Sequence, residues 1–195
     1  MLSGGEEKTE RSAAGGFAVY EPRLTDEDRD DRGDRGEGIK ALIRPAVDED
    51  VAAILRTQRA AGRTKTGAGA LEAAISDLER FVVVAAVDKE LVGWGKTHCW
   101  SYADGPALAG HYLGGVTVAP EWRRRGIGAD LAQARLNWIW QRSALAWYVV
   151  NASNTASIAL HQRWGFAEAA RAAKFHSTEF SGGVGLLLRA SRERR

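Results

Sequence analysis

The sequence predicts an α/β fold in which a sheet of mixed direction carries helices on both faces. Three observations predict this fold. Apolar, β-branched runs of strand length alternate along residues 39–190 with segments of helical periodicity. Two of these runs, at 81–87 and 91–100, are separated only by Asp88, Lys89 and Glu90, which is typical of an antiparallel hairpin with a tight turn at Asp88-Lys89. The chain has 195 residues, 45% of them hydrophobic, which suffices for one domain with a substantial core.

The first part of the pattern predicts a strand, two helices and the hairpin. The expected elements are a strand at 39–44 closed by Pro45, a helix from 48 to about 61, a loop at 62–69, a helix at 71–80 and the two hairpin strands. Asp48 is the expected N-cap of the first helix. Leu71, Ile75 and Leu78 share one face of the second helix, which we expect to be buried.

The second part predicts a strand, a helix, a strand and a helix, followed by two closing strands. We expect strands at 111–118 and 145–150, helices at 126–141 and 155–164, and a closing hairpin of 169–176 and 184–190 around a Gly-Gly turn near 182–183. Asn154 is the expected cap of the last helix, which stops at Gly165. The buried stripe of the long helix is expected to consist of Ile127, Leu131, Ala134 and Trp138.

The charges are divided unevenly between a tail and the domain. Residues 1–38 carry 11 acidic and 6 basic side chains, whereas residues 39–195 carry 14 acidic and 21 basic ones. Positions 25–38 contain no apolar side chain, so burial cannot offset the entropy lost on ordering them. We therefore expect a disordered or loosely docked acidic tail at 1–38, a folded domain at 39–190 and a basic C-terminal tail at 191–195. The basic domain suits an anionic ligand.

The composition also excludes several classes of protein. Cys99 is the only cysteine, so no intramolecular disulfide is possible. The residues near Met1 lack the apolar core of a signal peptide, and no apolar run is long enough to cross a bilayer. We expect a reduced, cytoplasmic protein. The four histidines and the cysteine show no metal-ligand spacing, so no metal is expected.

Residues 112–129 are the most informative stretch of the chain. A β-branched run ends at Pro120, a turn with three arginines follows, and Gly126 and Gly128 open the long helix. The start of a helix leaves N–H groups unpaired and carries a partial positive charge. Because the glycines have no side chain to keep an anion away, this segment predicts a binding site for a phosphate or pyrophosphate. The alternative is a solvated basic turn that caps an ordinary helix.

Two blocks of residues carry a resemblance to a known family. The first, Arg123-Arg124-Arg125-Gly126-Ile127-Gly128, fits the pattern Gln/Arg-x-x-Gly-x-Gly/Ala after a strand. The second is an Asn followed by a short helix and Gly-Phe, here from Asn154 to Phe166. With both blocks, the chain resembles the GNAT superfamily of acetyl-coenzyme A-dependent N-acetyltransferases over residues 39–190. The resemblance implies a mostly antiparallel sheet whose central strands, 111–118 and 145–150, splay apart.

The resemblance also implies a mode of cofactor binding. The pyrophosphate of acetyl-CoA would lie over the N–H groups of residues 124–129, and the amides of the pantetheine arm would pair with an open strand edge. The asparagine of the second block would touch the cofactor in addition to capping its helix. The residues implied to bind acetyl-CoA are Val116, Thr117, Val118, Arg123, Arg124, Arg125, Gly126, Ile127, Gly128, Ala129 and Asn154.

The implied reaction is direct attack of an amine on the thioester. The amine must lose a proton, the developing oxyanion needs a donor such as the N–H of Val118, and the departing thiolate needs an acid. His161 stands where many relatives carry a tyrosine acid. With an ordinary pKa of about 6.5, it could donate a proton at neutral pH. The alternative is a surface histidine packed on Trp164.

The base is less evident from the sequence. Val149 stands where some relatives carry a glutamate base, and Tyr112 stands on the cofactor strand, where others place theirs. The two-residue period of a strand places Tyr112 on the face of Val116 and Val118, so it either lines the cleft or packs in the core.

Other polar and aromatic residues are weaker candidates. Histidines at strand ends and near the closing hairpin could act on substrate or satisfy local hydrogen bonds, and they are His98, His111 and His176. Tryptophans are expected in the core or the pocket wall, and they are Trp94, Trp100, Trp147 and Trp164. The acceptor is expected to be a small-molecule or peptide amine, bound by walls at 62–70, 98–110 and 171–184. Candidate partners for its charge are Asp77, Asp104 and Glu179, although solvated surface charge is the stronger interpretation.

Two other functions stay open at this stage. The missing carboxylate base keeps open an inactive, acyl-CoA-binding regulatory module. The arginines also suit nucleic acid, but the Gly-x-Gly helix opening favours a compact phosphate ligand, and no aromatic stacking motif accompanies them. We expect no nucleic acid and no membrane as a partner, and a homodimer is compatible with the sequence.

Overall fold

The computed structural model describes residues 40–64 and 66–192, so the predicted acidic tail at 1–38 lies outside the described residues. The strands are β1 (Leu42–Pro45), β2 (Val82–Val87), β3 (Glu90–Trp100), β4 (Gly110–Val118), β5 (Leu145–Asn151), β6 (Ala167–Ala172), β7 (Lys174–Phe175), β8 (Thr178–Glu179) and β9 (Gly185–Ser191). The helices are α1 (Val51–Ala60), α2 (Ala68–Ser76), α3 (Ile127–Trp140) and α4 (Thr155–Gln162), with short 3₁₀ turns at Asp48–Asp50, Pro120–Trp122 and Ser181–Gly183. None of these helices is long and apolar enough to span a membrane.

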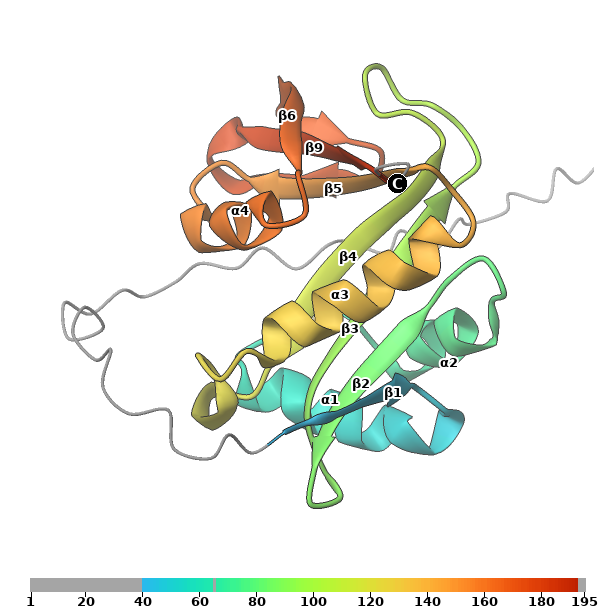
Figure 1. Cartoon of the computed structure of the whole chain (residues 1–195), viewed down its shortest axis with the longest axis vertical. Helices are drawn as coiled ribbons and strands as arrows, with labels where there is room; N and C mark the ends of the chain where they lie inside the picture. Colours follow the sequence, from blue (N-terminus) through green and yellow to red (C-terminus); the bar gives the residue numbers. More distant parts are fainter. Residues whose placement is uncertain (1–39, 65, 193–195) are drawn as a thin grey trace, which may run out of the picture.

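The strands form one seven-stranded sheet in the order β1-β2-β3-β4-β5-β9-β6, and β7 and β8 form a separate ribbon. Every neighbouring pair in the large sheet is antiparallel except β4 and β5. Helix α3 packs on one face through Ile127 and Leu131, while α1 and α2 cover the other through Ile54 and Leu71. Figure 1 shows α3 in front of the sheet and α1 and α2 behind it. The predicted mixed sheet with helices on both faces is confirmed.

The two central strands separate soon after they meet. Parallel β4 and β5 pair only at Tyr112–Trp147 and Leu113–Tyr148, although β4 continues to Val118. At the point of separation, Gly114 and Gly115 of β4 lie opposite the single residue Lys96 of β3, which makes a β-bulge. Beyond the bulge, the edge of β4 that faces β5 has no strand partner among the described residues. The splay implied by the family resemblance is thus present.

The structure corrects several predicted details. Asp48 does not cap the first helix; instead, the Asp50 carboxylate accepts the Val47 N–H at 2.9 Å and pairs with Arg44 at 2.6 Å. Helix α2 begins and ends earlier than predicted, so Leu78 lies beyond it and is 87% exposed. The closing strands β6 and β9 do pair, but the β7–β8 ribbon lies between them in the chain. Strand β9 extends to Ser191, so the fold continues beyond the predicted boundary at 190.

The hairpin turn and the cap of α4 are confirmed. Asp88 and Lys89 both have positive φ, at 46° and 73°, as a tight two-residue hairpin turn requires. The Asn154 side chain accepts the Ser157 N–H at 3.1 Å and caps α4. The buried stripe of α3 is wrong in part, because Ala134 and Trp138 are only partly buried. The fully buried positions that the period did not predict include Arg135.

Candidate active site

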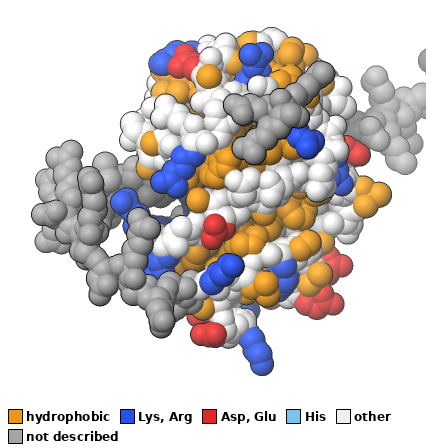
Figure 2. All heavy atoms as spheres, viewed as in Figure 1, with side chains coloured by type: hydrophobic (Ala, Val, Ile, Leu, Met, Phe, Trp, Pro, Cys, Tyr) orange, Lys and Arg blue, Asp and Glu red, His pale blue; other side chains and the backbone are white. Residues whose placement is uncertain are grey.

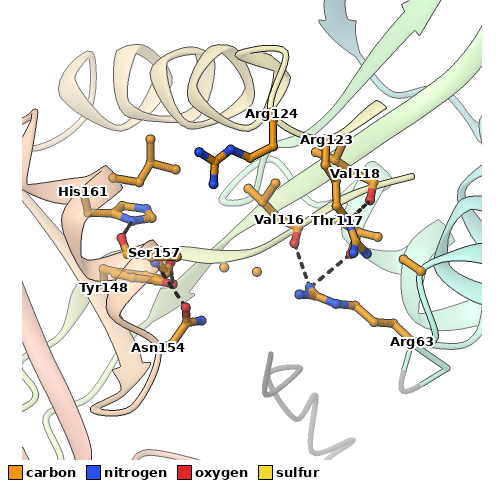
Figure 3. A pocket seen from close by; sticks show the side chains of 15 residues that line it. Arg63, Val116, Thr117, Val118, Arg123, Arg124, Tyr148, Asn154, Ser157 and His161 are labelled. Atoms are coloured by element: carbon orange, nitrogen blue, oxygen red, sulfur yellow. Dashed lines mark hydrogen bonds between the residues drawn. The ribbon is translucent and has the colours of Figure 1, made fainter. Parts of the chain in front are cut away.

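A cleft of about 280 Å³ opens where β4 and β5 separate. Its lining comes from the end of β4, the turn before α3, the α1–α2 loop, β5 and α4. Figure 3 shows His161, Ser157, Tyr148 and Asn154 on one side of the cleft and Arg63 with the β4 residues on the other. The lining residues are Ala61, Arg63, Gly114, Gly115, Val116, Thr117, Val118, Arg123, Arg124, Tyr148, Asn154, Ala156, Ser157, Leu160 and His161. They include three arginines and no carboxylate.

The open edge of β4 presents its backbone to the cleft at alternate residues. The Ala119 N–H donates to the Val92 carbonyl of β3 at 2.8 Å, so the backbone groups of Val118 point the other way, toward the cleft. The Val116 and Val118 carbonyls accept side-chain bonds from Arg63 at 2.7 Å and from Arg123 at 3.3 Å. Strand alternation turns the backbone of Thr117 toward β3, so only its side chain reaches the cleft.

The start of α3 supplies unpaired N–H groups beside this edge. Gly126 is the N-cap with φ of 86°, and Arg124 also has positive φ, at 63°. The Gly126 carbonyl accepts the Ala129 N–H at 2.8 Å. Among the described residues, no hydrogen bond involves the backbone N–H groups of 124–128. The N–H groups of 124–128 are therefore available to an anion, whereas the Ala129 N–H is already used.

The arginines of the turn have different orientations. Arg123 and Arg124 line the cleft, whereas the Arg125 guanidinium lies 5.0 Å from the Trp122 ring centroid. Arg63, from the loop after α1, adds a third cationic side chain that sequence reasoning missed. Its position in a loop rich in Gly and Thr gave no local signal. In the view of Figure 2, Lys and Arg side chains gather on the left side of the molecule, where α3 begins in Figure 1.

Tyr148 and His161 form a stacked pair on the β5 side of the cleft. Their ring centroids are 4.0 Å apart with nearly parallel planes, and the Tyr148 hydroxyl lies 2.7 Å from Ser157 Oγ. Burial raises the pKa of Tyr148, although the Ser157 bond and the nearby charge of Arg135 oppose that shift. Tyr148 is therefore a protonated phenol near neutral pH that faces the cleft. Sequence reasoning missed it because it lies in an apolar strand run.

His161 is neutral near pH 7, so the predicted acid role is not supported. The ring is only 3% exposed, and burial lowers its pKa to about 4, with Arg135 lowering it further and the Ser157 bond opposing. Nδ1 lies 2.7 Å from the Ser157 carbonyl, so Nδ1 carries the hydrogen and Nε2 has the lone pair. A neutral ring of this tautomer has no proton at Nε2 to give. The premise of an ordinary pKa is wrong here because the helix position is buried.

This lowered pKa predicts a pH-dependent stability. The folded pKa of His161, about 4, lies below its ordinary 6.5, so the unfolded chain binds the extra proton between these values. Stability attributable to His161 is complete above about pH 6.5 and falls as the pH drops toward 4, by at most roughly 3 kcal/mol. His161→Phe should flatten the curve of unfolding free energy against pH over this range, as measured by urea denaturation. An equally steep curve in the variant would contradict the assignment.

Tyr112 does not lie on the face of Val116 and Val118, contrary to the sequence-based prediction. It packs with Trp147 and Phe175, and its hydroxyl donates to the Leu108 carbonyl at 2.6 Å. Burial raises its pKa. The bulge at Gly114 and Gly115 adds one residue and reverses the face of every position before it. Tyr112 therefore belongs to the core behind the sheet and does not line the cleft.

Arg135, a residue of α3, donates hydrogen bonds to backbone carbonyls on both strands of the bulge. Its guanidinium Nη1 donates to the Gly114 carbonyl at 2.7 Å and to the Lys96 carbonyl at 3.1 Å, and Nε donates to the Leu131 carbonyl at 3.0 Å. The side chain is completely buried, which lowers its pKa to about 10. The chain thus keeps a buried cation where the strands diverge. A charged residue on an apolar stripe was the only signal in the sequence.

The remaining candidates lie outside the cleft. His176 stacks on Trp100 at 4.5 Å, and His98 packs beside Gly114, where a Cβ would lie 3.1 Å from its Nε2. Burial lowers the pKa of both histidines. None of the four candidate tryptophans lines the cleft: Trp94 and Trp147 are buried, Trp164 bonds Gln133 and Trp100 stacks on histidine.

The candidate acids are engaged locally as well. Asp104 accepts the His176 N–H at 2.7 Å, Asp77 pairs with Arg80 at 2.9 Å and Glu179 lies 3.8 Å from Lys174. Val149, at the position where some relatives carry a glutamate, is buried in the core.

Comparisons with known proteins agree on the family. The family model described as Acetyltransferase (GNAT) family matches residues 49–166. The ribosomal-protein-S18-alanine N-acetyltransferase of Escherichia coli is similar in structure, with a TM-score of 0.63 and 17% identity over 80% of this chain and 96% of that one. A ribosomal-protein-alanine N-acetyltransferase of Brucella melitensis has a TM-score of 0.62 and 24% identity over 77% of this chain and 99% of that one.

The Salmonella typhimurium protein yncA, solved with its cofactor acetyl-CoA, gives a TM-score of 0.63 at 20% identity over 80% of this chain and 95% of that one. A comparison with curated proteins found no match. The family model covers more than half of the chain, and the cleft has the unpaired N–H groups and the open strand edge that the family resemblance implies. The chain therefore belongs to the acetyltransferase (GNAT) family and is an acetyl-CoA-dependent N-acetyltransferase.

Proposed function

We propose that the enzyme transfers the acetyl group of acetyl-CoA to a primary amine by direct attack of the amine on the thioester. One observation carries the proposal. A single cleft combines the unpaired N–H groups of 124–128 with an open edge of β4. The first feature suits a diphosphate, and the second suits the amides of an extended pantetheine arm.

In this proposal the pyrophosphate lies over residues 124–128, with Arg123 and Arg124 beside it. The pantetheine amides pair with the backbone of Val116 and Val118, so Arg63 and Arg123 release those carbonyls when the cofactor binds. Asn154, at the cap of α4, contacts the arm from the opposite wall. The backbone N–H groups of Thr117 and Ala129 do not donate to the cofactor in this proposal, because the first faces β3 and the second donates to the Gly126 carbonyl. Arg125 contributes charge at longer range.

The chemistry requires a donor for the oxyanion and a proton for the sulfur. The amine nitrogen bonds to the carbonyl carbon, and the oxyanion accepts a hydrogen bond from the N–H of Val118 or Val116, whichever the pantetheine amides leave unpaired. As the C–S bond breaks, the thiolate takes a proton from the Tyr148 hydroxyl, which regains one through Ser157 and solvent. Since no carboxylate lines the cleft, the amine proton leaves to water.

The test is thiol release from acetyl-CoA in the presence of amines, with mass detection of the acetylated product. The panel includes small alkyl amines, amino acids, aminoglycosides and peptides with a free N-terminus, each compared with a reaction that lacks amine. We expect one thiol per acetylated amine. Because an alkyl ammonium has a pKa of about 10, kcat/KM should rise about tenfold per pH unit from about pH 7 to 9. CoA binding without amine-dependent thiol release across the panel would instead indicate the inactive regulatory module.

A further inference from the structure

A cluster of three potential metal ligands lies at the end of β4 opposite the cleft. It consists of Glu79, Cys99 and His111, whose carboxylate oxygen, Sγ and ring nitrogen all lie within 4.8 Å of one another. His111 is near the start of β4, whereas the cleft adjoins its end at Val116 and Val118. No step of the proposed acetyl transfer uses these side chains.

The fold brings the three residues together from separate elements. Cys99 of β3 and His111 of β4 are register partners in the antiparallel pair, so their side chains project from the same face of the sheet. Glu79 comes from the turn after α2, where the Asp77 side chain accepts the Glu79 N–H at 2.9 Å and fixes the backbone. Spacing along the chain cannot show this cluster. The sequence-based expectation of no metal depended on that spacing.

The histidine of the cluster is buried, and one of its ring nitrogens has no hydrogen-bond partner among the described residues. His111 is 8% exposed, and this nitrogen is Nδ1. Its ring meets Trp138 of α3 edge to face, with centroids 5.4 Å apart, and Phe81 stacks on the same tryptophan. This apolar wall excludes water from one side of the cluster. The exposed Glu79 side chain leaves the other side open to solvent.

Nearby cations are held by other groups. Arg80 pairs with Asp77 at 2.9 Å, and the Arg142 guanidinium lies 3.8 Å from the Trp138 ring centroid. Both side chains therefore have partners outside the cluster. The carboxylate of Glu79 and a thiolate at Cys99 would provide the negative charge that a divalent cation needs.

We propose that Glu79, Cys99 and His111 bind a zinc-class divalent cation, with water as the fourth ligand. Thiolate and imidazole ligands favour Zn²⁺ over Mg²⁺ or Ca²⁺, which prefer oxygen ligands. Tetrahedral zinc bonds of about 2.0–2.3 Å place ligand atoms roughly 3.3–3.8 Å apart, so the three ligand atoms, which lie within 4.8 Å of one another, need only move slightly closer to bind the ion. The ion would join the turn after α2 to β3 and β4.

The experiment uses the fact that Cys99 is the only cysteine of the chain. The rate of Cys99 alkylation is measured on the full-length protein with and without Zn²⁺, with Mg²⁺ and after chelation. Zn²⁺ should slow the reaction at least about tenfold, Mg²⁺ should not, and a chelator should restore the rate. Co²⁺ substitution should give a thiolate-to-cobalt absorption band.

Glu79→Gln is the informative variant because the Glu79 side chain is exposed, so we expect the fold to tolerate the change. It should weaken Zn²⁺ protection of Cys99 by about 10-fold or more, whereas Asp88→Asn, a matched change in the exposed β2–β3 turn, should leave protection unchanged. His111→Gln, checked for folding by circular dichroism, should also lose protection. Equal protection in wild type and Glu79→Gln, or alkylation that Zn²⁺ does not slow, would overturn the proposal.

Discussion

Tyr148→Phe is expected to lower kcat by about 100-fold or more, because a positioned acid contributes about 10²–10⁴-fold. The variant removes the only phenol that lines the cleft in the described part of the chain. It keeps the ring that stacks on His161 at 4.0 Å, so the shape of the cleft should persist. The KM for acetyl-CoA should change little, since the phenol acts on the departing sulfur rather than on the bound nucleotide. Steady-state kinetics with the best amine of the panel measures both constants.

Tyr112→Phe provides the matched control for this change. This variant also loses a hydrogen bond of a buried hydroxyl, the one that Tyr112 donates to the Leu108 carbonyl at 2.6 Å. Tyr112, however, lies in the core behind the sheet. We expect it to cost about 1 kcal/mol of stability with kcat within a few-fold of wild type. A full kcat in Tyr148→Phe, or an equal loss in both variants, would refute the acid role of Tyr148. A kcat equal to that of wild type in His161→Phe at neutral pH would agree with the neutral state of that histidine.

Gly128→Glu is expected to weaken CoA binding by roughly 100-fold or more, equivalent to about 2.7 kcal/mol. Gly128 is the second residue of α3, its φ is not positive, and no atom lies within 4 Å of the position where a Cβ would stand. A glutamate there fits the fold and favours the helix start electrostatically. It would nevertheless place a negative side chain where the diphosphate is proposed to bind. Isothermal titration with CoA measures the change.

Gly69→Glu is the control for the glycine substitution. Gly69 also lies in the first turn of a helix, α2, and the space around its Cβ position is open. The two variants therefore change charge and helix propensity equally and differ in their distance from the proposed phosphate site. CoA affinity should be that of wild type in Gly69→Glu. Similar affinities in both variants would mean that the start of α3 does not hold the diphosphate.

The features that the sequence predicted correctly depend on local physical chemistry. The helix start at Gly126, the cap at Asn154 and the Asp88-Lys89 turn each involve residues only a few positions apart. Such features follow from backbone sterics and nearby hydrogen bonds, which short sequence patterns encode. The alternation of strands and helices is likewise visible in the sequence, so the sheet and its helical layers could be predicted.

The wrong predictions concern positions whose structure is determined by contacts between residues far apart in the sequence. The bulge at Gly114 and Gly115 moves Tyr112 to the other face, and the Gly114 carbonyl in this bulge accepts a hydrogen bond from Arg135 of α3. Packing against Tyr148 and Phe166 buries His161, and this burial lowers its pKa to about 4. The sequence did not indicate Tyr148, because its position in the cleft follows from the separation of β5 from β4. Periodicity alone cannot indicate a bulge or a buried charge.

Amide exchange in the presence and absence of CoA tests the central claim most directly. We expect CoA to shift and protect the backbone N–H groups of Val116, Val118 and residues 124–128, as followed by nuclear magnetic resonance. The Ala119 and Ala129 N–H groups, already bonded to Val92 and Gly126, should keep their protection unchanged. CoA binding that protects amides elsewhere and leaves both the β4 edge and the start of α3 unaltered would contradict the proposed cofactor site.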